Sequence, residues 1–179
     1  MKFSGLAAIV LAVSVTAAPA KRDAATVESD LAGISTQVNN LNSAITRFGS
    51  SKSLIDALAI ASDANSLDSA IKQATTDTTA SVAFTEGEGS TILSAIQALA
   101  PNIVATLQNL DSQHDNVASL PIPGIDGDIE SELNTLNTDT AALETALLSK
   151  TPSDDQTDEQ TAFDTIDAAF TAALSTYSS

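Results

Sequence analysis

The feature that most constrains the fold of this chain is an unbroken apolar seam close to its N-terminus. Large apolar residues recur there at alternating gaps of four and three positions, which places them along one face of an α-helix. The seam consists of Val27, Leu31, Ile34, Val38, Leu41, Ile45 and Phe48. Its other face carries only Glu28, Asp30 and Arg47 as charges, whereas a coiled coil usually flanks its seam with Glu and Lys. The pattern predicts a long helix that buries its seam in its own bundle, against another protein or around an apolar ligand.

Further helical patterns follow along the chain, separated by Gly, Pro and polar clusters. We predict that Gly49 ends the first helix, and that further helices follow around Leu54–Leu58, Leu67–Phe84, Ile92–Leu110, Ile129–Leu147 and Phe163–Tyr177. Breaks are expected at Ser62–Asn65, at the turn Glu86–Gly89, at the irregular segment Leu120–Asp128 and at the acidic turn Thr151–Glu159. The sequence thus predicts an all-α protein, a single up-and-down bundle of about five or six helices.

Several details of the helix ends can also be read from the sequence. Thr85 with Glu88, and Ser153 with Gln156, have the spacing of a capping box at a helix N-terminus. Pro101 lies inside the Ile92–Leu110 pattern and should kink that helix, because proline removes one backbone donor and clashes one turn back.

The helical stripes also predict the interior. Besides the seam, we expect an apolar lining or surface-binding face formed by Leu58, Ile71, Phe84, Ile96, Leu99, Ile103, Leu107, Leu136 and Leu143. Aromatic residues are only 3% of the chain and Ala is frequent, and facing helices lined with Ala and Leu can either pack tightly or leave a cavity. A dry cavity costs stability, so its presence would imply a ligand.

The first residues have the features of a secretion signal. Lys2 precedes the apolar run Leu6–Val15, which is too short to span a bilayer and is followed by small residues. Lys21-Arg22 is then a dibasic pair of the kind that kexin-type proteases cleave. We therefore predict a signal peptide at 1–18, a pro-segment at 19–22, a helical bundle over 23–152, and an acidic turn with a C-terminal helix packing on it over 153–179. The mature protein is expected to be extracellular and not transmembrane.

Charge and composition exclude several classes of function. The chain has 7 basic and 23 acidic residues. Cleavage after Arg22 would remove three basic side chains and leave four against 23 acidic ones, a formal charge of −19. Nucleic acids and anionic lipid surfaces require basic patches, so neither is an expected partner. The absence of cysteine excludes thiol catalysis and cysteine-based zinc sites.

Candidate catalytic and metal-binding residues are few. His114 is the single histidine, and the chain has no G-x-S-x-G elbow, so a partly buried bundle histidine is favoured over a catalytic one. Asp126 and Asp128 match the first two ligands of an EF-hand, but the turn glycine and the final glutamate are missing, which favours a helix N-terminus. The acidic residues Asp154, Asp155, Asp158 and Glu159 can be read as a loose cation site or, preferably, as a solvated turn and helix start. We expect no catalytic residue, metal site or cofactor.

One combination of spacings resembles a known family. It comprises Leu99, Pro101 and Ile103, then Leu107 and Leu110, the turn Leu120-Pro121, and the stripe Leu133, Leu136, Thr140, Leu143 and Leu147 before Pro152. This pattern resembles the fungal hydrophobic surface-binding protein A family (HsbA), also described as cell wall galactomannoproteins. The resemblance covers roughly Ala24 to Pro152 and rests on apolar spacing and prolines, not on a catalytic signature.

The resemblance implies a small, secreted, non-enzymatic all-α protein, and it leaves three functions open. The first is adsorption to hydrophobic surfaces, where some members recruit polyester-degrading esterases of the cutinase type. The second is a carrier that holds fatty acid or another lipid inside the bundle. The third is a structural cell wall mannoprotein with a filled core. An enzyme is the least favoured class, because a chain without Trp lacks the stacking platforms that sugar sites use.

Overall fold

The structure is a computed structural model that describes residues 23–178. The predicted signal peptide, pro-segment and dibasic site lie outside these residues. The described part contains six α-helices: α1 (Ala24–Ser51), α2 (Leu54–Ala80), α3 (Glu86–Ser112), α4 (His114–Ala118), α5 (Ile125–Leu148) and α6 (Ser153–Tyr177). The all-α prediction is confirmed.

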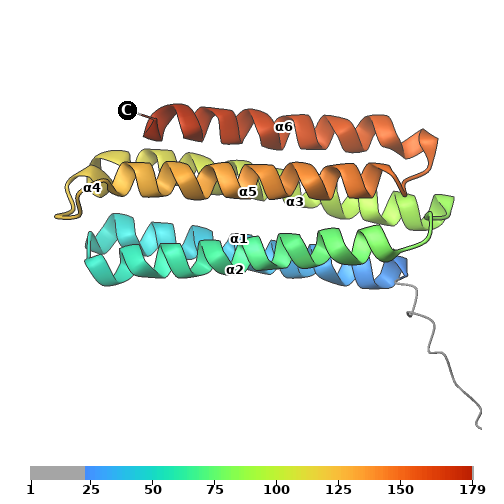
Figure 1. The fold of residues 1–179 in the computed structure, drawn as a ribbon, viewed down its shortest axis with the longest axis horizontal. Helices are drawn as coiled ribbons and strands as arrows, with labels where there is room; N and C mark the ends of the chain where they lie inside the picture. Colours follow the sequence, from blue (N-terminus) through green and yellow to red (C-terminus); the bar gives the residue numbers. More distant parts are fainter. Residues whose placement is uncertain (1–22, 179) are drawn as a thin grey trace, which may run out of the picture.

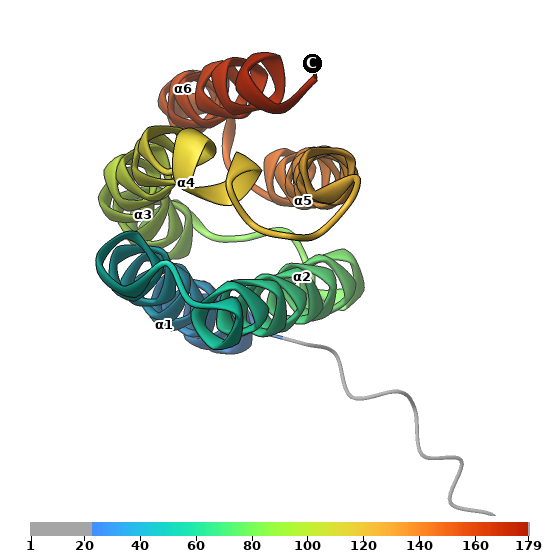
Figure 2. The ribbon, with the colours of Figure 1, turned by 90° about the vertical axis from the view of Figure 1, so that its left-hand side faces the viewer.

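The five long helices run along a common axis and alternate in direction along the chain (Figure 1). Viewed from one end, they form a ring in the order α1, α2, α5, α6, α3, with each helix packed against its two neighbours (Figure 2). The short α4 lies at one end of this ring, where it contacts α3 and α5. This arrangement is the single up-and-down bundle that the sequence predicts, and α6 closes the ring between α5 and α3.

Helix α1 shows how the seam specifies the fold. All seven seam residues from Val27 to Phe48 are buried, with exposures between 0% and 8%. The Asp23 side chain accepts a hydrogen bond from the Thr26 amide and caps the N-terminus. The helix runs through Gly49 and ends at Ser51, where Lys52 adopts a left-handed conformation with φ of 51°. The prediction that Gly49 ends the helix is therefore wrong, because the αL residue that terminates it is Lys52.

Two predicted breaks are absent. Helix α2 continues through Ser62–Asn65, because Ala64 and Leu67 anchor it in the core. Within this stretch, Asn65 Nδ2 donates to Ala61 O at 2.7 Å. The helix ends at Ala80, so Val82 and Phe84 follow it and do not belong to it. Likewise, Glu86–Gly89 is the first turn of α3 and not a separate turn.

Of the two predicted capping boxes, one forms. The Thr85 amide donates to Glu88 Oε2 at 2.8 Å, and the Glu88 amide donates to Thr85 Oγ1 at 3.4 Å. At α6 the N-cap position is taken by Pro152, so the box between Ser153 and Gln156 is wrong. Gln156 Nε2 instead donates to the carbonyls of Thr151 and Leu148.

Helix α3 contains Pro101 and is nevertheless continuous from Glu86 to Ser112. Among the described residues it is the one helix long and apolar enough to cross a membrane by length and composition. Its buried residues Ile92, Ile96, Leu99 and Leu107 belong to the common core, and core helices meet the same criterion.

The two ends of the ring are built differently. At the closed end, where α1, α3 and α6 begin, the segment after α2 crosses the ring and inserts the buried side chain of Phe84. This segment is tied to the end of α5, since the Phe84 amide donates to Lys150 O at 2.8 Å and Lys150 Nζ donates to Ser81 O at 2.9 Å. At the opposite end, α4 and the segment 119–124 cover the ring, and the interior is hollow.

Candidate ligand-binding cavity

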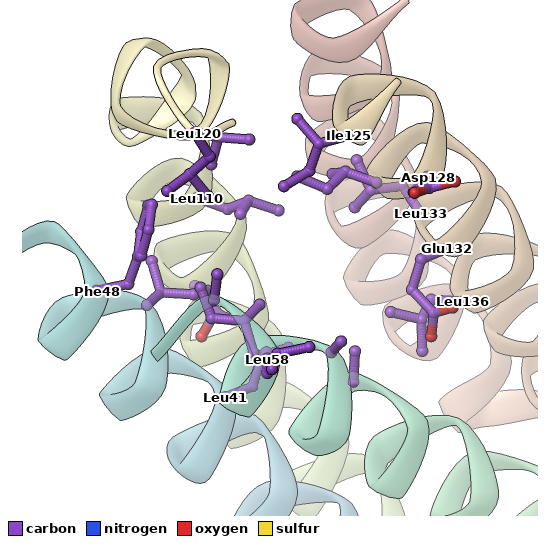
Figure 3. Close-up of a pocket in the computed structure, with 18 of the residues that line it drawn as sticks. Leu41, Phe48, Leu58, Leu110, Leu120, Ile125, Asp128, Glu132, Leu133 and Leu136 are labelled. Carbon is purple, nitrogen blue, oxygen red and sulfur yellow. The ribbon is translucent and has the colours of Figure 1, made fainter. Parts of the chain in front are cut away.

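A cavity of about 390 Å³ occupies the end of the bundle that α4 covers. Five of the helices and the segment after α4 contribute to its walls, and Figure 3 shows the side chains converging on it. The lining consists of Leu41, Ile45, Phe48, Ala57, Leu58, Ile60, Ala61, Ala64, Thr106, Leu107, Leu110, Val117, Leu120, Ile122, Ile125, Asp128, Ile129, Glu132, Leu133 and Leu136. All but three of these side chains are apolar.

Small residues on α2 leave the space open. Ala57, Ala61 and Ala64 line the cavity on successive turns of this helix, whereas the buried positions Leu67 and Ile71 further along α2 carry large side chains. Short side chains on one wall leave space between the helices, although Leu58 and Ile60 of the same helix also line the cavity. The small residues of α2 therefore contribute to the open space at this end of the bundle.

The mouth of the cavity lies between α2 and α5. Leu58 and Ala61 of α2 and Asp128 of α5 are lining residues that are also exposed to solvent. In Figure 3, Leu58 on one side faces Glu132 and Leu136 on the other. Beyond the mouth, Lys72 Nζ of α2 lies 3.4 Å from Asp139 Oδ2 of α5 and 2.7 Å from Asp68 Oδ2 of α2. This ion-pair group joins the two helices where the cavity ends.

An apolar row extends from the mouth onto the surface. Leu54, Ile55 and Leu58 of α2 are 45%, 79% and 66% exposed. Large apolar side chains at such exposure are unusual when they lie together, and clusters of this kind mark contact sites. The remaining exposed large apolar residue of the described chain, Val82, follows the other end of α2.

The three polar side chains of the lining are Thr106, Asp128 and Glu132. Thr106 is buried, and its hydroxyl donates to Asn102 O at 2.8 Å. Burial raises the pKa of Glu132, and the negative charge of Asp68 adds to this, while Lys72 opposes it. No basic side chain of residues 23–178 lines the cavity.

The predicted lining residues divide into two groups. The structure brings six of them to the cavity: Leu41, Ile45, Phe48, Leu58, Leu107 and Leu136. The other residues, Val27, Leu31, Ile34, Val38, Ile71, Phe84, Ile96, Leu99 and Leu143, are buried in the solid core, and Ile103 packs half-buried against it. Helical stripes identify interior positions. Residues of both groups lie on the same stripes, so the stripes do not separate the cavity lining from the filled core.

Sequence reasoning missed most of the wall formed by α2 and α5. Ala57, Ala61 and Ala64 carry no apolar stripe of large residues, although their recurrence at gaps of four and three was a readable signal. Ile122 and Ile125 belong to a segment predicted to be irregular, and Glu132 is absent from the predicted lining. Only the fold brings this segment across the end of the ring.

Among the residues considered for chemistry, Asp128 alone lines the cavity. His114 packs edge-on against Tyr177, with ring centroids 5.1 Å apart, and its Nδ1 is 3.7 Å from Asp115 Oδ1. Asp126 and Asp128 lie in the first turn of α5, as expected for a helix N-terminus. Within the described residues, no group of three His, Asp or Glu side chains is arranged to hold a metal ion.

Glu159 contradicts the expectation of a solvated acidic turn. Helix α6 begins at Ser153, and Glu159 is a fully buried residue of that helix. Burial raises its pKa, and the negative charges of Asp155 and Glu144 add to the effect, while the Thr151 side chain partly opposes it. The carboxyl group is close to Thr151 and belongs to the closed end, away from the cavity.

A second, wider groove lies outside the ring between α3 and α6. Its volume is about 440 Å³, and it is lined by residues that include Gln97, Pro101, Gln108, Asp158 and Thr165. Because this lining is more polar and open to solvent, the groove is a weaker ligand site than the interior cavity.

The fold and cavity define a class: a closed ring of helices that encloses an apolar ligand-sized space at one end. The comparisons agree with this class. The model of the family described as hydrophobic surface binding protein A matches residues 24–149, and the chain belongs to this family. A comparison with curated protein sequences finds no match.

Solved structures show the same fold. AFMP4P, solved in complex with palmitic acid, is 32% identical, with a TM-score of 0.81 over 87% of this chain and 99% of that one. Ligand binding domain 2 of the Penicillium marneffei MP1 protein, complexed with multiple arachidonic acids, is 21% identical, with a TM-score of 0.78 over 89% of this chain and 98% of that one. Ligand binding domain 1 of the MP1 protein, complexed with arachidonic acids, is 15% identical, with a TM-score of 0.67 over 83% and 98%.

Proposed function

We propose that this protein is a non-enzymatic carrier that holds the hydrocarbon chain of a single-chain lipid in the cavity and exchanges it through the mouth between α2 and α5. The observation that carries the proposal is the cavity itself, about 390 Å³ of space with almost entirely apolar walls. This volume falls in the range of roughly 300 to 1,000 Å³ that small-molecule sites occupy.

The energetics favour an occupied cavity. At ~24 cal/mol per Å³, a sealed dry space of about 390 Å³ would cost about 9 kcal/mol, which is an upper value here because the mouth is open to solvent. The whole free energy of unfolding of a domain is about 5–15 kcal/mol, so such a cost would consume most of it. A hydrocarbon chain in the cavity would restore the missing contacts, and the fatty acids bound to AFMP4P and the MP1 domains support this kind of occupant.

A second activity is supported by the exposed row of Leu54, Ile55 and Leu58. We propose that this row adsorbs to hydrophobic surfaces, where its side chains would leave water as those of interfacial helices do. Because Leu58 also lines the cavity, adsorption would place the mouth against the phase that supplies the lipid. Secretion, cell wall association and recruitment of a cutinase-type esterase stay predictions from the sequence and its resemblance.

Lipid binding can be tested with a cavity-filling variant. In Ala64→Phe the new ring would occupy the cavity, so affinity for a fluorescent long-chain alcohol in titrations should fall at least about tenfold. Ala80→Phe is the matched control, because Ala80 is exposed at the other end of the same helix. The carrier function is rejected if the delipidated wild-type protein binds no long-chain lipid, or if both variants bind it like wild type.

Adsorption is tested separately through Ile55, which is outside the cavity lining. Depletion of the protein from solution by hydrophobic polyester particles should persist at high salt and fall severalfold in Ile55→Asp, because the new charge must be desolvated on contact. Val82→Asp is the control, since Val82 is exposed far from the mouth. Equal adsorption of the two variants would remove this row as the contact surface.

A further inference from the structure

The polar lining of the cavity is chemically one-sided. The hydroxyl hydrogen of Thr106 is already donated to Asn102 O, which leaves its oxygen as an acceptor. Ionised Asp128 and Glu132 accept hydrogen bonds and donate none. The side chains that line the cavity therefore offer a ligand acceptors and no free donor.

The positive charges of the described chain do not change this balance. Arg47, Lys52 and Lys150 are absent from the lining. Lys72 is near enough for its charge to act on Glu132, but its ammonium group already pairs with Asp68 at 2.7 Å and with Asp139 at 3.4 Å. An anionic ligand group at the mouth would find its cation occupied by two carboxylates.

The N-terminus of α5 is a further source of donors at this end of the cavity. Gly124 is its N-cap residue and no side chain caps the first amides, which would ordinarily favour an anion. However, Asp126 and Asp128 lie in the first turn of α5, so two acidic side chains already offset the positive end of the helix dipole. An ionised carboxylate at this end of the cavity would meet acidic side chains on the same helix.

We infer that the cavity selects long-chain amphiphiles whose polar end donates hydrogen bonds and carries no negative charge, with Asp128 and Glu132 at the mouth as the specificity-determining residues. This inference rests on the proposed carrier function. The hydrocarbon chain lies among the apolar walls, and the polar end lies beside α5, where Asp128 is exposed and Glu132 half-buried. A primary ammonium group binds best, a hydroxyl or amide group follows, and an ionised carboxylate binds worst.

The test compares three probes that share one hydrocarbon chain: dodecylamine, dodecanol and laurate. Each is titrated into the delipidated protein at neutral pH, the two ionic probes below their micelle concentrations and dodecanol below its solubility limit. We expect dodecylamine to bind at least about tenfold more tightly than laurate, because charge-assisted hydrogen bonds are the strong ones and like charges repel. Dodecanol should fall between them. Dodecyltrimethylammonium keeps the charge without a donor and should bind more weakly than dodecylamine.

Two variants of α5 assign the effect to the mouth. Glu132→Gln removes the charge and adds an amide donor, so the ratio of dodecylamine to laurate affinity should fall by about fivefold or more. Glu130→Gln makes the same change on the same helix outside the lining and should leave the ratio unchanged. Dodecanol affinity should be unchanged in Glu130→Gln, and dodecanol should still bind Glu132→Gln, though more weakly than wild type, which shows that the cavity is intact.

The outcomes separate this inference from the carrier function. If none of the probes binds, both proposals fall. If dodecanol binds and laurate binds as tightly as dodecylamine, the carrier function stands and the inferred selectivity is wrong. Selectivity that is unchanged in Glu132→Gln would show that Glu132 is not its source. Equal binding of dodecyltrimethylammonium and dodecylamine would show that positive charge, and not hydrogen-bond donation, determines the selectivity.

Discussion

The closed end and the cavity end of this bundle are formed by the same five long helices, yet one is solid and the other is hollow. At the closed end, Phe84 is inserted between the helices and the polar tie from Lys150 to Ser81 holds the covering segment in place. At the cavity end, three alanines of α2 face the centre. The comparison teaches that a uniform apolar seam forms the ring at both ends, while the side chains that meet across it, Phe84 at one end and the α2 alanines at the other, differ in how much space they fill.

The largest effects should come from enlarging alanines at the two ends of α2. Ala74→Phe, at a fully buried position of the solid half, should lower the free energy of unfolding by about 1–3 kcal/mol or more, because there is no space for the ring. Ala64→Phe should raise the free energy of unfolding of the lipid-free protein by about 0.5–2 kcal/mol, since filling a cavity restores contacts. Urea unfolding of both variants measures the difference. Destabilisation of equal size in both would mean that the two ends are packed alike.

Glu159 should give the closed end a dependence on pH. Its pKa is raised by burial from an ordinary value near 4.5. As the pH rises through that ordinary value, the unfolded chain releases the proton first, so the stability of the folded state falls until the folded-state pKa is passed. Each unit by which the pKa is raised corresponds to about 1.4 kcal/mol.

Glu159→Gln should therefore be more stable than wild type at neutral pH, and the difference should disappear below the ordinary pKa of glutamate. Thermal unfolding across this pH range measures the effect. Asp158→Asn is the control, because it removes the same charge from the exposed neighbouring position. A parallel shift of both variants would point to net charge and not to the buried carboxyl group.

The polar contacts of Lys150 and Lys72, which join helices at the two ends, should show a smaller difference in their contributions to the free energy of unfolding. Lys150→Met removes the donor to Ser81 O and should cost about 1–3 kcal/mol, because a buried carbonyl loses its partner. Lys72→Met breaks the pair with Asp139, but the Lys72 side chain is 55% exposed, so its cost should be smaller and should shrink further in salt. Chemical unfolding at low and high salt compares them. A larger loss of unfolding free energy in Lys72→Met would mean that the ion pair beside the mouth is the stronger of the two contacts.

Much of the fold could be predicted from local patterns. The α1 seam, the Thr85–Glu88 capping box and the helical periods specify an all-α bundle, since they depend on neighbours within one or two turns. Errors arose where longer-range contacts override local signals. Ser62–Asn65 looked like a break, but burial of Ala64 and Leu67 keeps α2 continuous. Ser153 and Gln156 looked like a cap, but Gln156 bonds to the end of α5.

The candidate site was less predictable than the fold. Leu41 and Phe48 reach the cavity while Val27 and Val38 are packed in the solid core, although all four lie on one stripe of one helix. What differs is the residue that each meets across the ring, and that partner is fixed by the order of the helices. Hence the stripe identified interior positions without identifying which of them border open space.

By itself, the sequence determined that the chain forms long amphipathic helices, that these helices share an apolar interior, and that the protein carries a strong negative charge. These properties depend on the period and composition of the chain, which are local. The tertiary structure alone decided that α2 and α5 leave a mouth between them, that Asp128 and Glu132 border it, and that Glu159 is buried. These depend on which side chains meet across the ring, and a cavity exists only as the volume that such meetings leave unfilled.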